Sequence, residues 1–82
     1  MGDTITVRFF AGARAAAGVP QVTVPAGCTL DELITMLADR HGQRLAAVLE
    51  CASFLVDGSA CRDRTVVLPA GTVDVLPPFA GG

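Results

Sequence analysis

The 82-residue sequence has the length of one domain, and a domain of this size buries only about 60% of its unfolded surface. Apolar residues make up 51% of the chain, so we expect some apolar side chains to stay exposed as a surface for a partner. Its charged residues, six arginines and eight acids with no lysine, give a net charge of -2, which argues against nucleic-acid binding.

The first part of the chain predicts a β-hairpin. Residues 4–11 alternate apolar and polar side chains and are rich in β-branched and aromatic types, which favours a half-buried strand. Residues 19–24 resume this β character and stop at Pro25. Residues 12–18 form an alanine-rich stretch bounded by glycines. We therefore expect two paired strands joined by a long connection.

The main helix is predicted to begin after Thr29 and to run to about His41. Thr29 precedes Glu32 by three residues, the spacing of a capping box. Apolar residues then recur along one helical face: Leu30, Leu33, Ile34, Leu37 and Ala38. Asp31 and Glu32 diverge by about 100°, so we expect solvated residues and no acid–base pair. Gly42 is a natural stop for the helix.

The second half predicts a return to strands. Residues 45–50 are typical of a helical turn, and residues 53–56 of a strand that runs into the turn pair Asp57-Gly58. Residues 66–68 are typical of a short strand or turn, and residues 72–76 of the last strand. Pro77 ends that strand because proline cannot donate to the ladder.

This order of elements predicts an α+β domain of the β-grasp, or ubiquitin-like, class. One main helix would cross one face of a small mixed sheet. A right-handed crossover through the helix would make the first and last strands parallel neighbours in the middle of the sheet. We expect the domain to span residues 1–76 and a flexible diglycine tail to span residues 77–82.

The remaining chemistry-bearing residues predict no site of their own. Cys28, Cys51 and Cys61 lack disulfide or zinc spacing, so we expect small buried hydrophobes in a reducing compartment. We interpret His41 as a solvated residue near a helix end, with a role as base for a reactive cysteine as the minor alternative. The chain contains no signal peptide, long apolar run or phosphate loop, so we expect a cytoplasmic protein without membrane contact or bound cofactor.

The last six residues, Pro-Pro-Phe-Ala-Gly-Gly, predict a projecting reactive end. Pro77 and Pro78 favour a polyproline-like stem, and six residues at about 3.1 Å each would reach about 19 Å. Gly81 and Gly82 have no Cβ to hinder entry into a narrow site or attack at the terminal carbonyl. A separate ATP-using enzyme would activate the carboxylate as an acyl-adenylate, and sulfur would convert it to a thiocarboxylate. A frayed end or an expression scar is the alternative.

Several residues show a resemblance to a known family. These are Val-Arg-Phe-Phe-Ala at residues 7–11, Arg14, Gly18, and Leu-Pro-Pro-Phe-Ala-Gly-Gly at residues 76–82. With them, the chain resembles the MoaD and ThiS family of ubiquitin-like sulfur carriers. The Pro-Pro and Gly-Gly ending is more similar to the molybdopterin branch than to the thiazole branch. The chain departs from the family at Ala15 and at Thr72-Val73, where members often carry acids.

The resemblance implies a sulfur-carrying small subunit of molybdopterin synthase that is not catalytic on its own. An E1-like (MoeB-like) adenylyltransferase would adenylate Gly82 with ATP, and a sulfurtransferase or persulfide donor would form the thiocarboxylate. The sulfur would pass to cyclic pyranopterin monophosphate in the large (MoaE-like) subunit, within a heterotetramer. The tail would contact the partner through six residues: Leu76, Pro77, Pro78, Phe79, Ala80 and Gly81.

Other functions remain open at this point. The diglycine end is equally suited to a sulfur carrier for thiamine or cysteine synthesis. It is also suited to a ubiquitin-like modifier that forms amide links to lysines of other proteins.

Overall fold

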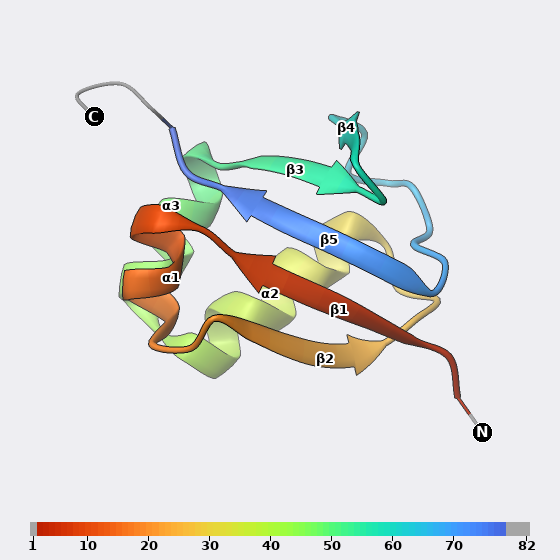
Figure 1. Ribbon diagram of the computed structural model, residues 1–82, viewed down its shortest axis with the longest axis horizontal. Helices are drawn as coiled ribbons and strands as arrows, with labels where there is room; N and C mark the ends of the chain where they lie inside the picture. Colours follow the sequence, from red (N-terminus) through yellow and green to blue (C-terminus); the bar gives the residue numbers. More distant parts are fainter. Residues whose placement is uncertain (1, 79–82) are drawn as a thin grey trace.

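The computed structural model describes residues 2–78, so Met1 and residues 79–82 lie outside the described part. Its elements follow in the order β1 (Thr4–Phe9), α1 (Ala11–Ala17), β2 (Gln21–Pro25), α2 (Leu30–His41), α3 (Gln43–Cys51), β3 (Ser53–Val56), β4 (Ser59–Cys61) and β5 (Gly71–Leu76). The strands form one five-stranded sheet in the order β2-β1-β5-β3-β4. Figure 1 shows α2 crossing behind the sheet, and α1 and α3 at the end where β1 and β5 finish.

The strand pairing confirms the predicted topology. β1 and β2 are antiparallel, and β1 and β5 are parallel, with Ile5 opposite Gly71 and Phe9 opposite Val75. β3 pairs with both β5 and β4 in antiparallel fashion. The first and last strands are therefore inner neighbours, as the crossover through the helix requires. This mixed sheet with a helix across it is the predicted β-grasp architecture.

The core lies between α2, α3 and one face of the sheet. Its buried side chains alternate along the strands and recur at helical spacing: Ile5, Val7, Phe9, Val24, Phe54, Val73 and Val75 from strands, and Leu30, Leu33, Leu37, Leu45 and Leu49 from helices. Burying each large apolar side chain stabilises the fold by about 1.5–3 kcal/mol. The opposite face of the sheet, here called the open face, carries the alternate residues Thr6, Arg8, Leu55, Thr72, Asp74 and Leu76.

Helix α2 begins as the capping box predicts. The Glu32 N–H donates to Thr29 Oγ1 at 3.1 Å, and the Thr29 N–H donates to Glu32 Oε1 at 2.8 Å. Gly42 ends the helix with a φ of 93°, and its N–H donates to the Ala38 carbonyl at 3.0 Å. The Thr29 cap contributes about 0.5–2 kcal/mol.

The alanine-rich stretch is a helix, so its prediction as a link was wrong. Alanine is the best helix former, and Ala13 is fully buried against the core. Gly18 is left-handed at φ 79°, and its N–H donates to the Arg14 carbonyl at 2.9 Å. This glycine therefore acts as a helix C-cap. Helix α3 is likewise longer than the predicted turn, with nine residues that bury Leu45 and Leu49.

The fourth strand also differs from the prediction. It follows directly from the turn at Asp57 and Gly58, whose φ values of 49° and 85° suit a tight hairpin. Residues 66–68 form an isolated bridge between Val67 and Thr29 in place of a strand. The loop between β4 and this bridge contacts the start of α2. The carbonyls of Arg64 and Val66 accept hydrogen bonds from the first N–H groups of α2.

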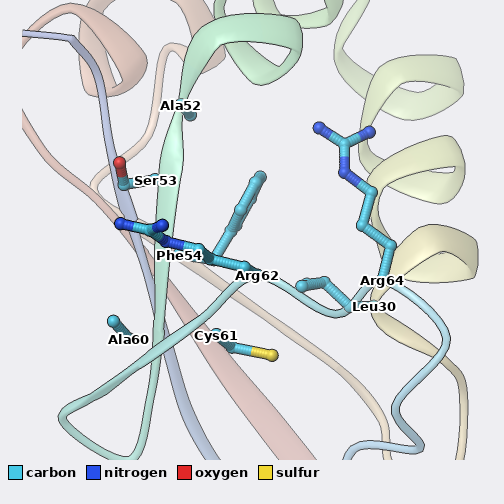
Figure 2. Close-up of a pocket in the computed structure, with 8 residues that line it drawn as sticks. All are labelled: Leu30, Ala52, Ser53, Phe54, Ala60, Cys61, Arg62 and Arg64. Carbon is cyan, nitrogen blue, oxygen red and sulfur yellow. The ribbon is translucent and has the colours of Figure 1, made fainter.

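The cysteine and histidine predictions were wrong in their burial. Cys51 is exposed, Cys28 and Cys61 are half-buried, and Cys61 lines an open pocket at the sheet edge (Figure 2). His41 is half-buried, and its ring packs edge-on against Phe9 with centroids 5.8 Å apart. Its Nε2 atom is buried and has no hydrogen-bond partner in the described structure. Between residues 2 and 78, no helix is long and apolar enough to cross a membrane.

Candidate functional site

The candidate site is the root of the tail, where β5 ends. Leu76 is the last strand residue, is half-buried and pairs with Ser53 of β3. Pro77 is half-buried and Pro78 is exposed. Because proline has no N–H to donate, the ladder stops at this position. The structure therefore places the first three of the predicted tail residues.

The other predicted tail residues are Phe79, Ala80, Gly81 and Gly82, and they lie outside the described residues. Their roles in partner contact and as the reactive end therefore stay predictions.

The root is held from both sides because β5 is an inner strand. β1 and β3 flank it through the parallel and antiparallel ladders. Beyond β1, the Phe10 N–H still donates to the Val75 carbonyl at 3.2 Å. Val73 and Val75 are buried in the core. The strand that leads into Pro77 is thus fixed by hydrogen bonds and by packing.

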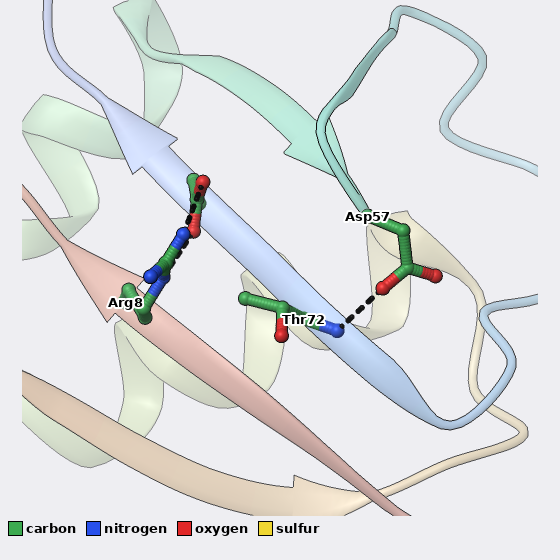
Figure 3. A network of polar contacts seen from close by, with 4 residues as sticks. Arg8, Asp57 and Thr72 are labelled. Carbon is green, nitrogen blue, oxygen red and sulfur yellow. Dashed lines mark hydrogen bonds and ion pairs between the residues drawn. The ribbon is translucent and has the colours of Figure 1, made fainter.

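An ion pair on the open face ties β5 to β1 just before the root (Figure 3). Arg8 Nε donates to Asp74 Oδ1 at 2.7 Å, and Arg8 Nη2 donates to Asp74 Oδ2 at 2.9 Å. Asp74 is only 7% exposed. The hydrogen bond and charge of Asp74 raise the pKa of the Arg8 guanidinium above its ordinary value. The bidentate geometry gives the two strands a specific, charge-assisted contact.

A second polar contact holds the start of β5 (Figure 3). The Asp57 N–H donates to the Thr72 carbonyl at 2.8 Å, and the Thr72 N–H donates to Asp57 Oδ1 at 2.9 Å. The Asp57 side chain thus supplies the hydrogen-bond acceptor for Thr72 one residue beyond the last β3–β5 pair, where the backbone of β3 turns away from β5. Gly71 permits this contact, because a Cβ there would lie 2.3 Å from Asp57 Oδ1.

One exposed and two half-buried apolar side chains lie near the root; the composition predicted exposed apolar residues but not their place. Phe10 is 39% exposed at the start of α1, and its ring centroid lies 5.7 Å from the Arg8 guanidinium carbon. Leu55 and Leu76 are half-buried on the open face. The sequence prediction gave no site role to Arg8 or Phe10. The alternation of side chains along β1 could have indicated their place. Arg8 and Phe10 lie two and four residues after the polar Thr6, so their side chains are expected on the same face as Thr6.

The acidic residues singled out in the sequence lie at the start of α2. Asp31 and Glu32 are both exposed, and Glu32 is engaged in the helix cap. Within residues 2–78, no three or more His, Cys, Asp or Glu side chains are placed to hold a metal ion. The described arrangement places apolar and charged side chains around the end of β5.

Comparisons with known proteins agree with this architecture. The model of the ThiS family matches residues 7–82. No curated protein matches the chain in sequence.

Solved structures show the same fold at low sequence identity. Small archaeal modifier protein 1 from Methanosarcina acetivorans is 21% identical with a TM-score of 0.81, over 100% of this chain and 99% of that one. Its namesake from Haloferax volcanii is 22% identical with a TM-score of 0.77, over 96% and 99%. A chain from the complex of subunits 1 and 2 of molybdopterin-converting factor from Helicobacter pylori is 22% identical with a TM-score of 0.71, over 96% and 99%. These likenesses confirm the β-grasp fold.

Proposed function

Because the chain belongs to the ThiS family, we propose that it is a sulfur carrier whose reactive group is the C-terminal carboxyl of Gly82. Its role would be that of the small subunit of molybdopterin synthase. The observation that carries the proposal is the continuity of the inner strand β5 with the Pro77-Pro78 stem and the diglycine end. A fixed strand aims the stem, and the glycines keep the reactive tip thin.

The chemistry takes place at the carboxyl group in two steps. On the E1-like adenylyltransferase, the Gly82 carboxylate attacks the α-phosphorus of ATP, and pyrophosphate leaves. Sulfide then attacks the carbonyl carbon, and AMP leaves. When a persulfide donor supplies the sulfur, its attack gives an acyl disulfide, which a second thiol cleaves to the thiocarboxylate while a disulfide forms on the donor. With hydrosulfide, the products are the thiocarboxylate, AMP and one proton. Activation is needed because a carboxylate oxygen is a poor leaving group.

Sulfur delivery would occur in the large synthase subunit. The thiocarboxylate sulfur attacks a side-chain carbon of cyclic pyranopterin monophosphate, and a carbon–oxygen bond at that carbon breaks, so that the oxygen leaves as water or as the freed phosphate ester oxygen. Hydrolysis of the resulting thioester then returns the Gly82 carboxylate. Two such deliveries supply the dithiolene of molybdopterin. The Helicobacter pylori structure is a complex of subunits 1 and 2, which supports a large-subunit partner for this chain. Phe10, Leu55 and Leu76 supply apolar contact area beside the stem.

A second candidate function is protein modification. Two of the similar structures are named small archaeal modifier protein 1. In this role the activated Gly82 carbonyl would be attacked by a lysine amine of a target protein, which forms an amide and releases the activating group. The chain has no lysine of its own, so it would be attached singly and would not build side-chain polymers.

The test is sulfur loading followed by intact-mass analysis. The purified protein is incubated with an E1-like adenylyltransferase, ATP and sulfide, and we expect a mass gain equal to the exchange of one oxygen for sulfur, localised to Gly82. Two matched variants lack Gly82 or carry one residue after it. Both should lose sulfur loading and keep the parent's urea midpoint, because the tail follows the last strand.

The acceptor is tested in a second reaction. Thiocarboxylated protein is mixed with a large synthase subunit and cyclic pyranopterin monophosphate, and we expect molybdopterin to form. Lack of sulfur loading on the intact protein, or equal loading of the Gly82 deletion, would overturn the carrier proposal. Lysine adducts bearing Gly-Gly on other cellular proteins, without sulfur on Gly82, would favour the modifier.

A further inference from the structure

A second site lies at the β4 edge of the sheet, apart from the tail. It is an open pocket of about 260 Å³, here called the arginine pocket. Its lining includes Leu30 at the start of α2, Phe54 on β3, and Arg62 and Arg64 in the loop after β4 (Figure 2).

The strand pairing explains why the sheet edge is hollow here. β4 pairs with β3 only from Phe54 to Val56, and Cys61 is its last paired residue. The chain leaves the sheet at Arg62, so Ser53 lies beyond the end of β4. Phe54 and Leu30 form an apolar floor, with exposures of 4% and 0%. The pocket therefore has an open rim and a floor of two buried core side chains.

The rim carries positive charge that the fold does not use. Arg62 and Arg64 are exposed, and neither forms an ion pair among residues 2–78. The acid between them, Asp63, is turned toward Thr65, from which its Oδ1 accepts hydrogen bonds of 2.9 Å and 2.6 Å. In Figure 2 the ring of Phe54 lies between the two arginine side chains. An anionic group next to an apolar group would satisfy both features.

We propose that the arginine pocket docks an acidic segment of a partner protein, in which a carboxylate pairs with Arg62 or Arg64 and a neighbouring apolar side chain packs on Phe54. Guanidinium groups bind carboxylates in a planar, bidentate manner. A volume of about 260 Å³ is below the range of about 300–1,000 Å³ for small-molecule sites. It is sufficient for one or two side chains of a peptide.

The position of the pocket indicates which partner would use it. Ser53 pairs with Leu76, so the pocket rim is one strand away from the root of the tail. A protein that receives the tail could place an acidic segment here at the same time. This choice of partner rests on the proposed function, whereas the binding chemistry of the pocket does not.

The test is an NMR titration of the full chain with a blocked peptide of alternating glutamate and leucine. We expect saturable amide shifts at Ser53, Cys61 and Arg62, and weaker shifts as salt is added. Arg62→Ala and Arg64→Ala should each weaken binding by up to about fivefold, the upper end of the range for one exposed ion pair. Arg44→Ala is the matched control, because Arg44 is also exposed but lies on α3.

A charge swap distinguishes charge-specific binding of the peptide from nonspecific binding. The double variant Arg62→Glu and Arg64→Glu should no longer bind the glutamate–leucine peptide and should bind a peptide of alternating arginine and leucine. Equal binding of a glutamine–leucine peptide by the parent protein, or equal loss in Arg44→Ala, would overturn the proposal. Sulfur loading of Gly82 is measured separately, so failure of the carrier role and failure of the pocket remain distinguishable.

Discussion

Replacement of Gly71 by alanine should destabilise the fold strongly. Gly71 has a φ of 153°, which alanine adopts only with strain. The new Cβ would lie 2.3 Å from Asp57 Oδ1 and 2.7 Å from Asp57 Oδ2. The carboxylate must then rotate away, and the Thr72 N–H loses its acceptor. Gly71→Ala therefore combines a backbone cost with the loss of one charge-assisted hydrogen bond.

The two costs set the expected magnitude. A hydrogen bond to a charged group is worth about 1.5–3 kcal/mol, and a residue held in a sparsely populated backbone region costs about 1–3 kcal/mol. We expect Gly71→Ala to lower the free energy of unfolding by about 2.5–6 kcal/mol, measured by urea unfolding followed by circular dichroism. Gly12→Ala is the control, because Gly12 is inside α1 with nothing within 4 Å of an added Cβ. It should stabilise the protein by about 0.5–1 kcal/mol.

A double-mutant cycle isolates the shared contact. Asp57→Gly removes the carboxylate and suits the φ of 49° at that position. In this background the hydrogen bond is already absent, so Gly71→Ala should cost only the backbone strain, about 1–3 kcal/mol. The same cost of Gly71→Ala in both backgrounds would refute the steric link between the two residues.

Three further predictions follow from single contacts. Arg8→Ala should lower the free energy of unfolding by about 1–3 kcal/mol, because it leaves the mostly buried Asp74 carboxylate without its donors. The control Arg44→Ala should lower it by less than about 0.5 kcal/mol. Equal losses in the two variants would contradict the argument. His41→Leu should keep or raise stability by up to about 1 kcal/mol, because it removes an Nε2 that has no hydrogen-bond partner among residues 2–78. His41→Ala should lower stability by leaving a hole beside Phe9, and a larger loss for leucine than for alanine would count against this view. The Thr65 hydroxyl and N–H lower the pKa of Asp63 below its ordinary 3.8, so the associated stability is present above the ordinary pKa and is lost as pH falls through the folded pKa. An NMR titration should show the Asp63 pKa rise toward 3.8 in Thr65→Val, and an unchanged value would contradict the assigned cause.

The errors in the secondary-structure prediction have two physical causes. Glycine at both ends of residues 12–18 suggested a link, but Gly18 caps a helix whose Ala13 is buried by the core. Residues 66–68 had β-branched character, but their loop hydrogen-bonds to the start of α2. In the first place, the helix propensity of alanine and the Gly18 cap were local signals that outweighed the flanking glycines. In the second place, contacts with distant residues outweighed the local pattern. The burial of Cys51 was misjudged for the same reason, since its exposure depends on where α3 ends.

Local chemistry was sufficient for the features that depend on neighbouring residues. The capping box at Thr29 and Glu32, the alternation of β1 and the stop at Pro77 each arise within a few residues. The β-grasp order followed, because helix and strand periodicities leave few ways to bury one continuous apolar face. The chemistry predicted for Gly82 also comes from covalent structure alone, because it requires a carboxyl group on an unhindered chain.

Only the tertiary structure decided which distant side chains meet. Arg8 reaches Asp74 because β1 and β5 pair in parallel at one particular register, and a shift of one residue would turn every side chain to the other face. Asp57 reaches Thr72 because β3 lies on the other side of β5. The arginine pocket exists because β4 ends one residue before Arg62. The sequence by itself therefore determined the β-grasp order, the cap of α2 and the end of β5, whereas strand register and loop packing determined the contacts that fix the end of β5 and the charged pocket at the β4 edge.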